Sequence, residues 1–291
     1  MKRQPKHMTN FPAAISFKIG IYVEYFVKWL MKYYGNVFDA IGASILWFLL
    51  NIEKFLIWLP WWIFVLVIFI MGWRIKKFMA GLLYAALLIL IGGFGYWELM
   101  MSTLAVVLIS VVISVVIGIP LGIFITYNAK IEVFMKPTLD AMQTMPSFVY
   151  LIPALLLFGL GKVPAVFATT IYSLPPMIRL TELGVRNVPK EMVEAAHAFG
   201  SSKWQTLVKV QLPQALPTIM TGINQTTMMA LAMVVISSMI GAKGLGMEVL
   251  IAISRIDIAR GFESGLSIVI LAIIIDRLSQ GIANRYKIPE K

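Results

Sequence analysis

Long apolar runs separated by short polar segments dominate this chain of 291 residues. A helix needs about 20 mostly apolar residues to cross the hydrocarbon core of a bilayer, and most of the runs reach that length. We therefore expect an all-α, polytopic membrane protein with about seven transmembrane helices. The apolar runs cover residues 55–73, 78–97, 99–126, 146–160, 163–180, 215–240 and 264–284.

Two of these runs have special features. The run at 146–160 is too short for a straight crossing, so it either begins in the preceding polar segment or is broken at Pro153. The run at 99–126 contains Gly118 and Gly122, and glycines at this spacing allow another helix to approach closely. We expect a tight helix contact there.

The first 54 residues are amphipathic and do not form a clear span. Charged residues such as Glu24 and Lys28 share one face at four-residue spacing, beside an apolar and aromatic face. Residues 16–34 therefore predict a helix that lies in the membrane interface. A weaker apolar stretch at 37–50 is short for a span. An eighth span at 37–54 is the alternative.

Composition agrees with a membrane protein. Hydrophobic residues make up 59% of the chain and charged residues 13%, which excludes a disordered protein and disfavours an ordinary soluble domain. The net charge of +11 comes from cations between apolar runs, where they anchor loops at lipid headgroups, so we expect no nucleic-acid partner. The chain has no cysteine and only two histidines, so we predict no disulfide and no metal site.

The segment at 181–214 is polar, charged and rich in helix signals. Pro189 begins a helix, and Gly200 ends it because glycine accepts the left-handed C-terminal conformation. Ser201 or Ser202 caps a second short helix, which we expect to end at Leu212-Pro213. The first helix carries an apolar stripe at i, i+3, i+4 and i+7 spacing, formed by Met192, Ala195, Ala196 and Phe199.

The basic residues indicate which side of the membrane this segment faces. With 181–214 in the cytoplasm, the inner loops hold 14 Lys and Arg residues and the outer loops hold 4. This agrees with the positive-inside rule. The same topology places the N-terminus outside, where its 7 basic residues weaken the asymmetry.

Within this segment one pattern resembles a known motif. The residues Glu194-Ala195-Ala196, Gly200 and Val210-Gln211-Leu212-Pro213 are similar to the EAA motif of permease subunits of binding-protein-dependent ATP-binding cassette importers. Val210 stands where the family usually has Ile. Four further runs resemble the glycine betaine/proline betaine branch of this family: Gln143–Pro146, Pro175–Arg179, Gly222–Gln225 and Gly241–Gly246. The resemblance covers roughly residues 95–285.

This resemblance implies a type I importer permease fold in three parts. Residues 1–54 form the N-terminal amphipathic segment, residues 55–97 form two leading transmembrane helices, and residues 98–291 form the core permease domain with the hairpin at 181–214. The hairpin is then the element that couples to an ATPase. Its expected coupling residues are Glu194, Ala195, Ala196, Phe199, Gly200, Leu212 and Pro213.

The resemblance also implies partners and a cargo. The chain works in the cell membrane as a homodimer with two ATPase subunits and an extracytoplasmic binding protein. It is not itself an enzyme: Gly161-Lys162 lacks the rest of a phosphate-binding loop, so ATP and Mg²⁺ belong to the ATPase. The expected function is uptake of glycine betaine or a related compatible solute by alternating access.

The transport pathway is expected among the later spans. Its candidate residues are Gln143, Thr144, Tyr172, Asn224 and Gln225. An amide in hydrocarbon must face protein or water, so Asn224 either lines the path or bonds a neighbouring helix. An aromatic face attracts a quaternary ammonium group, although a membrane tyrosine such as Tyr172 also serves in packing.

Three other functions are alternatives to betaine import. The same machine could carry choline, carnitine or proline. An ion-coupled secondary transporter would act alone and would usually show inverted repeats or buried charged pairs. A structural membrane anchor would leave the hairpin at 181–214 unexplained.

Overall fold

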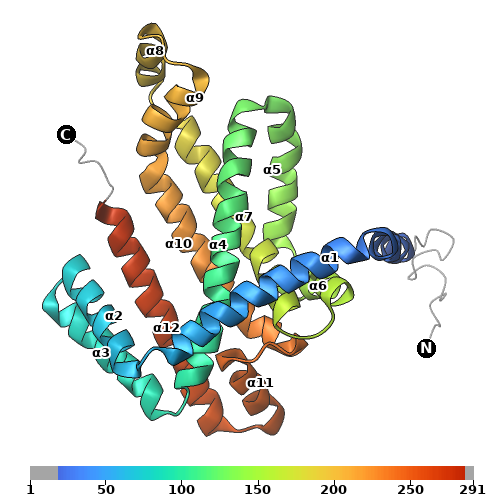
Figure 1. Cartoon of the computed structure of the whole chain (residues 1–291), viewed down its shortest axis with the longest axis vertical. Helices are drawn as coiled ribbons and strands as arrows, with labels where there is room; N and C mark the ends of the chain where they lie inside the picture. Colours follow the sequence, from blue (N-terminus) through green and yellow to red (C-terminus); the bar gives the residue numbers. More distant parts are fainter. Residues whose placement is uncertain (1–18, 286–291) are drawn as a thin grey trace, which may run out of the picture.

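A computed structural model describes residues 19–285, and all regular structure in that range is helical, as predicted (Figure 1). The longer helices and their short neighbours follow one another along the chain. They are α1 (Ile19–Trp58), α2 (Trp61–Ile75), α3 (Phe78–Gly93), α4 (Trp97–Tyr127), α5 (Ala129–Thr144), η2 (Ser147–Tyr150), α6 (Leu151–Phe158), α7 (Lys162–Arg186), α8 (Lys190–Ala198), α9 (Lys203–Thr206), η3 (Leu207–Gln211), α10 (Leu212–Ser237), η4 (Ser238–Ile240), α11 (Leu245–Arg255) and α12 (Ile258–Arg285).

Within the described residues, four helical stretches are long and apolar enough to cross a membrane: 20–58, 97–127, 203–240 and 258–283. A fifth arises if α5 and the following 147–158 segment count as one span, bent by 110°. The shorter apolar helix α3 lies within the predicted run at 78–97, whereas the run at 55–73 is divided between the end of α1 and α2. The run predicted at 163–180 lies within α7, a more polar helix that packs between α4 and α10.

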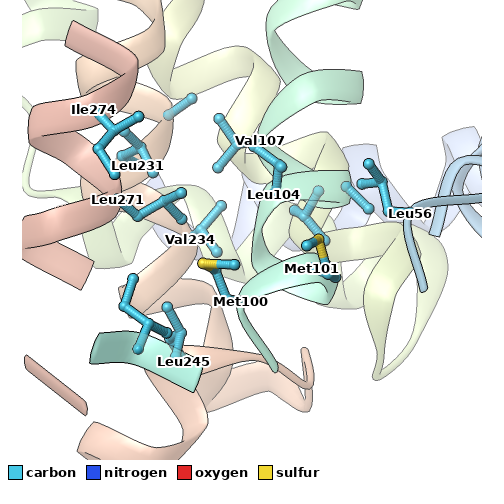
Figure 2. Close-up of a cluster of buried hydrophobic side chains, with 14 of the residues drawn as sticks. Leu56, Met100, Met101, Leu104, Val107, Leu231, Val234, Leu245, Leu271 and Ile274 are labelled. Atoms are coloured by element: carbon cyan, nitrogen blue, oxygen red, sulfur yellow. The ribbon is translucent and has the colours of Figure 1, made fainter. Parts of the chain in front are cut away.

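The core lies where α4, α10 and α12 meet. Figure 2 shows this cluster, with buried side chains from α1, α4, α10, α11 and α12 pointing toward one another. Farther along α4, a Cβ added to Gly122 would lie 2.7 Å from the carbonyl oxygen of Ile178. A Cβ on Gly118 would lie 2.6 Å from Cγ of Met177. The predicted tight contact is therefore confirmed, with α7 as the partner.

The N-terminal segment is organised differently from the prediction. The amphipathic helix at 16–34 and the weaker stretch at 37–50 are parts of one 40-residue helix, α1, as far as the described residues show. No proline interrupts residues 19–58, and the charge of Glu53 is paired inside the protein. The division after residue 54 therefore falls inside a helix, and the chain breaks instead at Leu59-Pro60. Residues 16–18 lie outside the described part.

The position of α1 is also distinctive. Figure 1 shows it running across the other helices rather than alongside them. It contacts α4, α6 and α7. At its crossing with α6, Phe38 meets Phe158 edge-to-face, with ring centroids 6.1 Å apart.

The helices differ from the prediction at two further places. The polar helix α5 precedes the short run at 146–160, and a sharp bend at Met145-Pro146 follows it. The second hairpin helix was expected to end at Leu212-Pro213, but it continues without a break into α10. A π-helical turn at Leu207–Gln211 makes this possible, because it loosens the backbone where Pro213 has no N–H to donate.

Candidate functional site

A helical hairpin projects from one end of the helix bundle (Figure 1). Its first helix, α8, follows Pro189 and carries Glu191 in its first turn, where the helix dipole favours an anion. The helix ends at Gly200, whose φ is +82°. The N–H of Ser201 donates to the carbonyl of Ala196 at 3.0 Å, which closes the C-terminal turn. The predicted stop at Gly200 is confirmed.

The second helix, α9, has a complete N-terminal cap. The backbone N–H of Gln205 donates to Oγ of Ser202 at 3.3 Å, and the side chain of Gln205 accepts from the Ser202 N–H at 2.8 Å. Of the two predicted caps, Ser202 is thus the one used. At the base of the hairpin, the hydroxyl of Tyr127 donates to the side chain of Gln211. The hairpin is therefore anchored to the end of α4.

The tip of the hairpin is left without a packing partner among the described residues. No residue of α8 is buried. Phe199 is 91% exposed and Trp204 72%, although both are large apolar side chains. Of the predicted coupling residues, Ala195, Ala196, Phe199 and Gly200 lie at this tip, whereas Glu194 lies nearer the base, beside a cavity that Gln211 also lines.

The other two predicted coupling residues lie at the root of α10. Pro213 is exposed. Leu212 is half-buried and packs against the cluster around Val185 and Ala215. Its position serves the attachment of the hairpin rather than its tip.

A network of ion pairs joins α5 to α7 beside the hairpin, and the sequence analysis missed it. Arg186 reaches Glu132 at 2.8 Å and Glu182 at 2.6 Å. Two turns earlier in α7, Arg179 pairs with Asp140. A cavity of about 250 Å³ opens next to Arg186 and is also lined by Glu194. The only signal in the sequence is the charged segment between the apolar runs at 99–126 and 146–160, which holds Glu132 and Asp140.

The predicted pathway residues fall in three separate places. Gln143 and Thr144 are exposed at the end of α5, next to the bend. Tyr172 on α7 lies edge-to-face with Tyr150, with ring centroids 5.6 Å apart. Gln225 on α10 is exposed.

Asn224 belongs to a polar contact between two helices. Its Nδ2 donates to Oδ1 of Asp276 on α12 at 3.1 Å, and its Oδ1 accepts from Ser279. Gln280 adds a second donor to the same carboxylate oxygen at 2.7 Å. Of the two alternatives for Asn224, these contacts favour a bond between neighbouring helices.

Several threonines on α7 and α10 carry buried hydroxyls with no hydrogen-bond partner among the described residues. They are Thr169, Thr170, Thr181 and Thr226. Unpaired hydroxyls are costly in a dry interior.

A buried ion pair is the second feature that the sequence did not reveal. Glu53 on α1 binds Lys162 at the start of α7, with Oε2 2.5 Å from Nζ. In the sequence analysis Lys162 entered only through the pair Gly161-Lys162, which lacks the rest of a phosphate-binding loop, and Glu53 had no predicted role. Nothing local to either residue indicates the other, which is 109 positions away.

Comparison with known proteins identifies relatives over most of the chain. Residues 118–288 match the family model described as "binding-protein-dependent transport system inner membrane component". The chain is 42% identical over 256 residues to the glycine betaine/proline betaine transport system permease protein ProW of Escherichia coli, covering 88% of this chain and 72% of that protein. It is 43% identical over 265 residues to the glycine betaine transport system permease protein OpuAB of Bacillus subtilis, covering 91% and 94%.

Two further relatives extend this picture. The glycine betaine/carnitine transport permease protein GbuB of Listeria monocytogenes is 49% identical over 231 residues, covering 78% of this chain and 82% of that protein. Among solved structures, a chain of the MetNI methionine ABC transporter in an inward-facing conformation superimposes with a TM-score of 0.59 at 23% identity, covering 64% of this chain and 93% of that one. That likeness agrees with the predicted permease fold.

Proposed function

Because this chain belongs to the family of binding-protein-dependent transport system inner membrane components, we propose that it carries glycine betaine or a related compatible solute through the cell membrane. The chain is a multi-pass permease subunit, and ATP hydrolysis resides in a partner subunit. A binding protein is the second partner that this family requires.

The observation that supports docking of a partner ATPase is the exposed tip of the hairpin. Phe199 and Trp204 are both exposed on the hairpin, and an exposed apolar patch often marks an interaction site. The tip is rigid because Gly200 and the Ser202 cap fix both helices, and Tyr127 fixes the base. We assign this tip to the ATPase, with Phe199 as its apolar anchor.

The alanines of α8 suit close docking. Ala195 is exposed and Ala196 half-buried, so a partner's backbone can approach the helix between the larger side chains. Glu194 offers a carboxylate beside this surface, but an exposed ion pair contributes only about 0–1 kcal/mol. The affinity of the contact therefore comes mainly from the apolar surface.

A homodimer with two ATPase subunits is the assembly we propose. In that assembly, closure of the ATPase pair by ATP moves two α8–α9 hairpins together. The anchors at Tyr127–Gln211 and in the π-helical turn transmit this motion to α4 and α10, because both helices are joined directly to the hairpin base. Alternating access of the pathway follows from that movement.

The cargo rests on the relatives. Three permeases that are 42–49% identical to this chain are named for glycine betaine, and the name of one of them also includes carnitine. A betaine is a fixed cation with a carboxylate, so an aromatic face and hydroxyl groups both suit it. Choline, carnitine and proline are the closest alternative cargoes.

The test is reconstitution of the chain with its ATPase and binding protein in proteoliposomes. Uptake of labelled glycine betaine, choline, carnitine and proline is measured with and without ATP inside the vesicles. We expect ATP-dependent uptake of glycine betaine. ATP-dependent uptake of a different solute only would overturn the assignment of the solute but not the class of transporter. Uptake by the chain alone along an ion gradient would overturn both.

A further inference from the structure

A carboxylate on α1 is buried against the first residue of α7. Oε1 and Oε2 of Glu53 lie 2.6 and 2.5 Å from Nζ of Lys162. Oε1 also accepts a hydrogen bond of 2.5 Å from Oγ of Ser102 on α4. The side chains of Glu53 and Lys162 are 10% and 20% exposed. Three helices that are far apart in sequence thus meet at one ion pair.

Stability alone does not account for such a pair. Desolvation of two charges offsets most of their attraction, and apolar replacements of a buried pair are often neutral or stabilising. Removal of one partner is different, because it leaves an uncompensated buried charge. A charged pair in a membrane protein therefore points to a role in fixing or switching a conformation.

Ser102 lies near the start of α4, whose other end, at Tyr127, holds the base of the α8–α9 hairpin. The ion pair therefore lies toward the end of the bundle away from the hairpin, which we call the distal end. Here Gly161, the neighbour of Lys162, donates its N–H to the carbonyl of Ile240 at 2.9 Å. This bond joins the start of α7 to the segment that ends α10. Gly161 and Gly241 both have positive φ, +125° and +90°, so these two segments of the chain meet at glycine turns.

The neighbour of Ser102 makes a matching contact. Thr103 accepts a hydrogen bond of 2.9 Å from the N–H of Leu245 at the start of α11. Gly244 packs so closely on Thr103 that an added Cβ would lie 2.6 Å from Oγ1. Both residues that bind Glu53 are therefore one peptide away from hydrogen bonds that join neighbouring segments at the distal end.

We propose that Glu53 is a positioning residue for transport that latches the start of α7 to α1 and α4 and so holds the distal end closed. The inference rests on the proposed function, in which the distal end must open to receive cargo. When it opens, Gly161 separates from Ile240 and Lys162 leaves Glu53 together with α7. In this proposal the long α1 helix controls the opening of the distal end.

The experiment uses the absence of cysteine in the chain, so that an introduced thiol is its only one. Ala242 lies in the distal turn and is 2% exposed, while Ala215 lies near the hairpin and is 1% exposed. Each is changed to Cys in separate variants, and the complete transporter is placed in nanodiscs. The rate of modification by a charged thiol reagent then reports opening at each end.

Glu53→Gln is the test variant because it keeps the shape and an acceptor for Ser102. Glu24→Gln is its matched control on the same helix, since Glu24 forms an exposed ion pair with Lys28 at 2.5 Å. We expect Glu53→Gln to raise modification of Ala242→Cys about tenfold, a bias of about 1.4 kcal/mol, and to leave Ala215→Cys unchanged. Glu24→Gln should leave both rates unchanged.

The exchanged pair Glu53→Lys with Lys162→Glu separates a latch from a merely structural role. It restores the attraction, so it should return the modification rate of Ala242→Cys toward that of the wild type. An unchanged rate in Glu53→Gln overturns the proposal, and so does an equal rise at both cysteines, or an exchanged pair as fast as Glu53→Gln. The labelling rates test the role of Glu53 even if the wild-type complex imports no betaine. Absence of betaine import would count against the proposed function instead.

Discussion

Asn224 on α10 donates a hydrogen bond of 3.1 Å to Asp276 on α12, inside the part of the chain that crosses the membrane. The same amide accepts a bond from Ser279, so one side chain makes two interhelical contacts. Interhelical hydrogen bonds in membrane proteins average about 0.6 kcal/mol and reach about 1.7 kcal/mol. Their joint loss therefore has a measurable effect on stability.

We predict that Asn224→Ala destabilises the folded protein by about 1–2 kcal/mol. The thermal midpoint, followed by size-exclusion chromatography of the heated protein in detergent, should fall. Gln225→Ala is the control, because Gln225 is the neighbouring amide and is exposed. Equal midpoints for the two variants would show that the contact between α10 and α12 is not made.

The close contact of α4 with α7 gives a second prediction. A Cβ at position 122 would lie 2.7 Å from the carbonyl oxygen of Ile178 and 2.7 Å from Cβ of Thr181, and neither atom can rotate away. Gly122→Ala should therefore cost about 1–3 kcal/mol through overpacking. The loss of folded protein on urea titration measures this change.

Gly265→Ala is the matched control for that substitution. Gly265 lies within α12, and an added Cβ would meet nothing within 4 Å. Alanine is the better helix former by about 1 kcal/mol, so this variant should be neutral or slightly stabilising. A loss of stability as large as that of Gly122→Ala would mean that the α4–α7 contact is not specific.

Removal of the exposed phenylalanine at the hairpin tip should weaken partner binding without lowering stability. Phe199→Ala should change the stability of the isolated chain by no more than about 0.5 kcal/mol, because the side chain is exposed. Binding to the ATPase should weaken by about 2 kcal/mol, roughly thirtyfold, as expected for an aromatic anchor. Calorimetric titration of the chain with the ATPase subunit gives both the affinity and its change.

Ile253→Ala serves as the control for the anchor. Ile253 is an apolar residue of α11 that is 70% exposed, at the opposite end of the bundle (Figure 1). Its removal should leave the ATPase affinity unchanged. If both substitutions weaken binding equally, the hairpin tip is not the docking surface.

The helix cap supplies a fourth prediction. Ser202→Ala removes an acceptor for the N–H of Gln205 and should destabilise α9 by about 1 kcal/mol. Amide hydrogen exchange at residues 203–206 should accelerate, while exchange in α12 should not. Ser201→Ala is the control, since the backbone of Ser201 and not its side chain closes the α8 turn.

Much of the fold was predictable because it depends on local patterns. Apolar runs identify helices in a bilayer whatever their neighbours are, and the glycine pair at Gly118 and Gly122 indicates a close contact without naming the partner. The hairpin turn was predictable for the same reason, because Gly200 and the serines act within a few residues. Position and type of these elements follow from short stretches of sequence.

The features that were missed depend on contacts over long distances. The attachment of α1 is an example: the carboxylate of Glu53 is buried because Lys162 and Ser102 lie beside it in space. In the same way, Pro213 indicated a helix end, but the π-helical turn before it allows the helix to continue through the proline. Of the pathway candidates, the role of Asn224 could not be decided before its partner on α12 was known.

The central claim is that ATP hydrolysis in a partner subunit drives betaine import through the α8–α9 hairpin. It is tested most directly by uptake of labelled glycine betaine into proteoliposomes that contain the complete transporter, as wild type or as Gly200→Asp. Gly200 has φ +82°, a backbone conformation that costs a residue with a Cβ about 1–2 kcal/mol, and the added carboxylate lies at the docking tip. We predict ATP-dependent uptake by the wild type and none by Gly200→Asp at equal protein content. Uptake by Gly200→Asp at the wild-type rate, or uptake without ATP, would contradict the account.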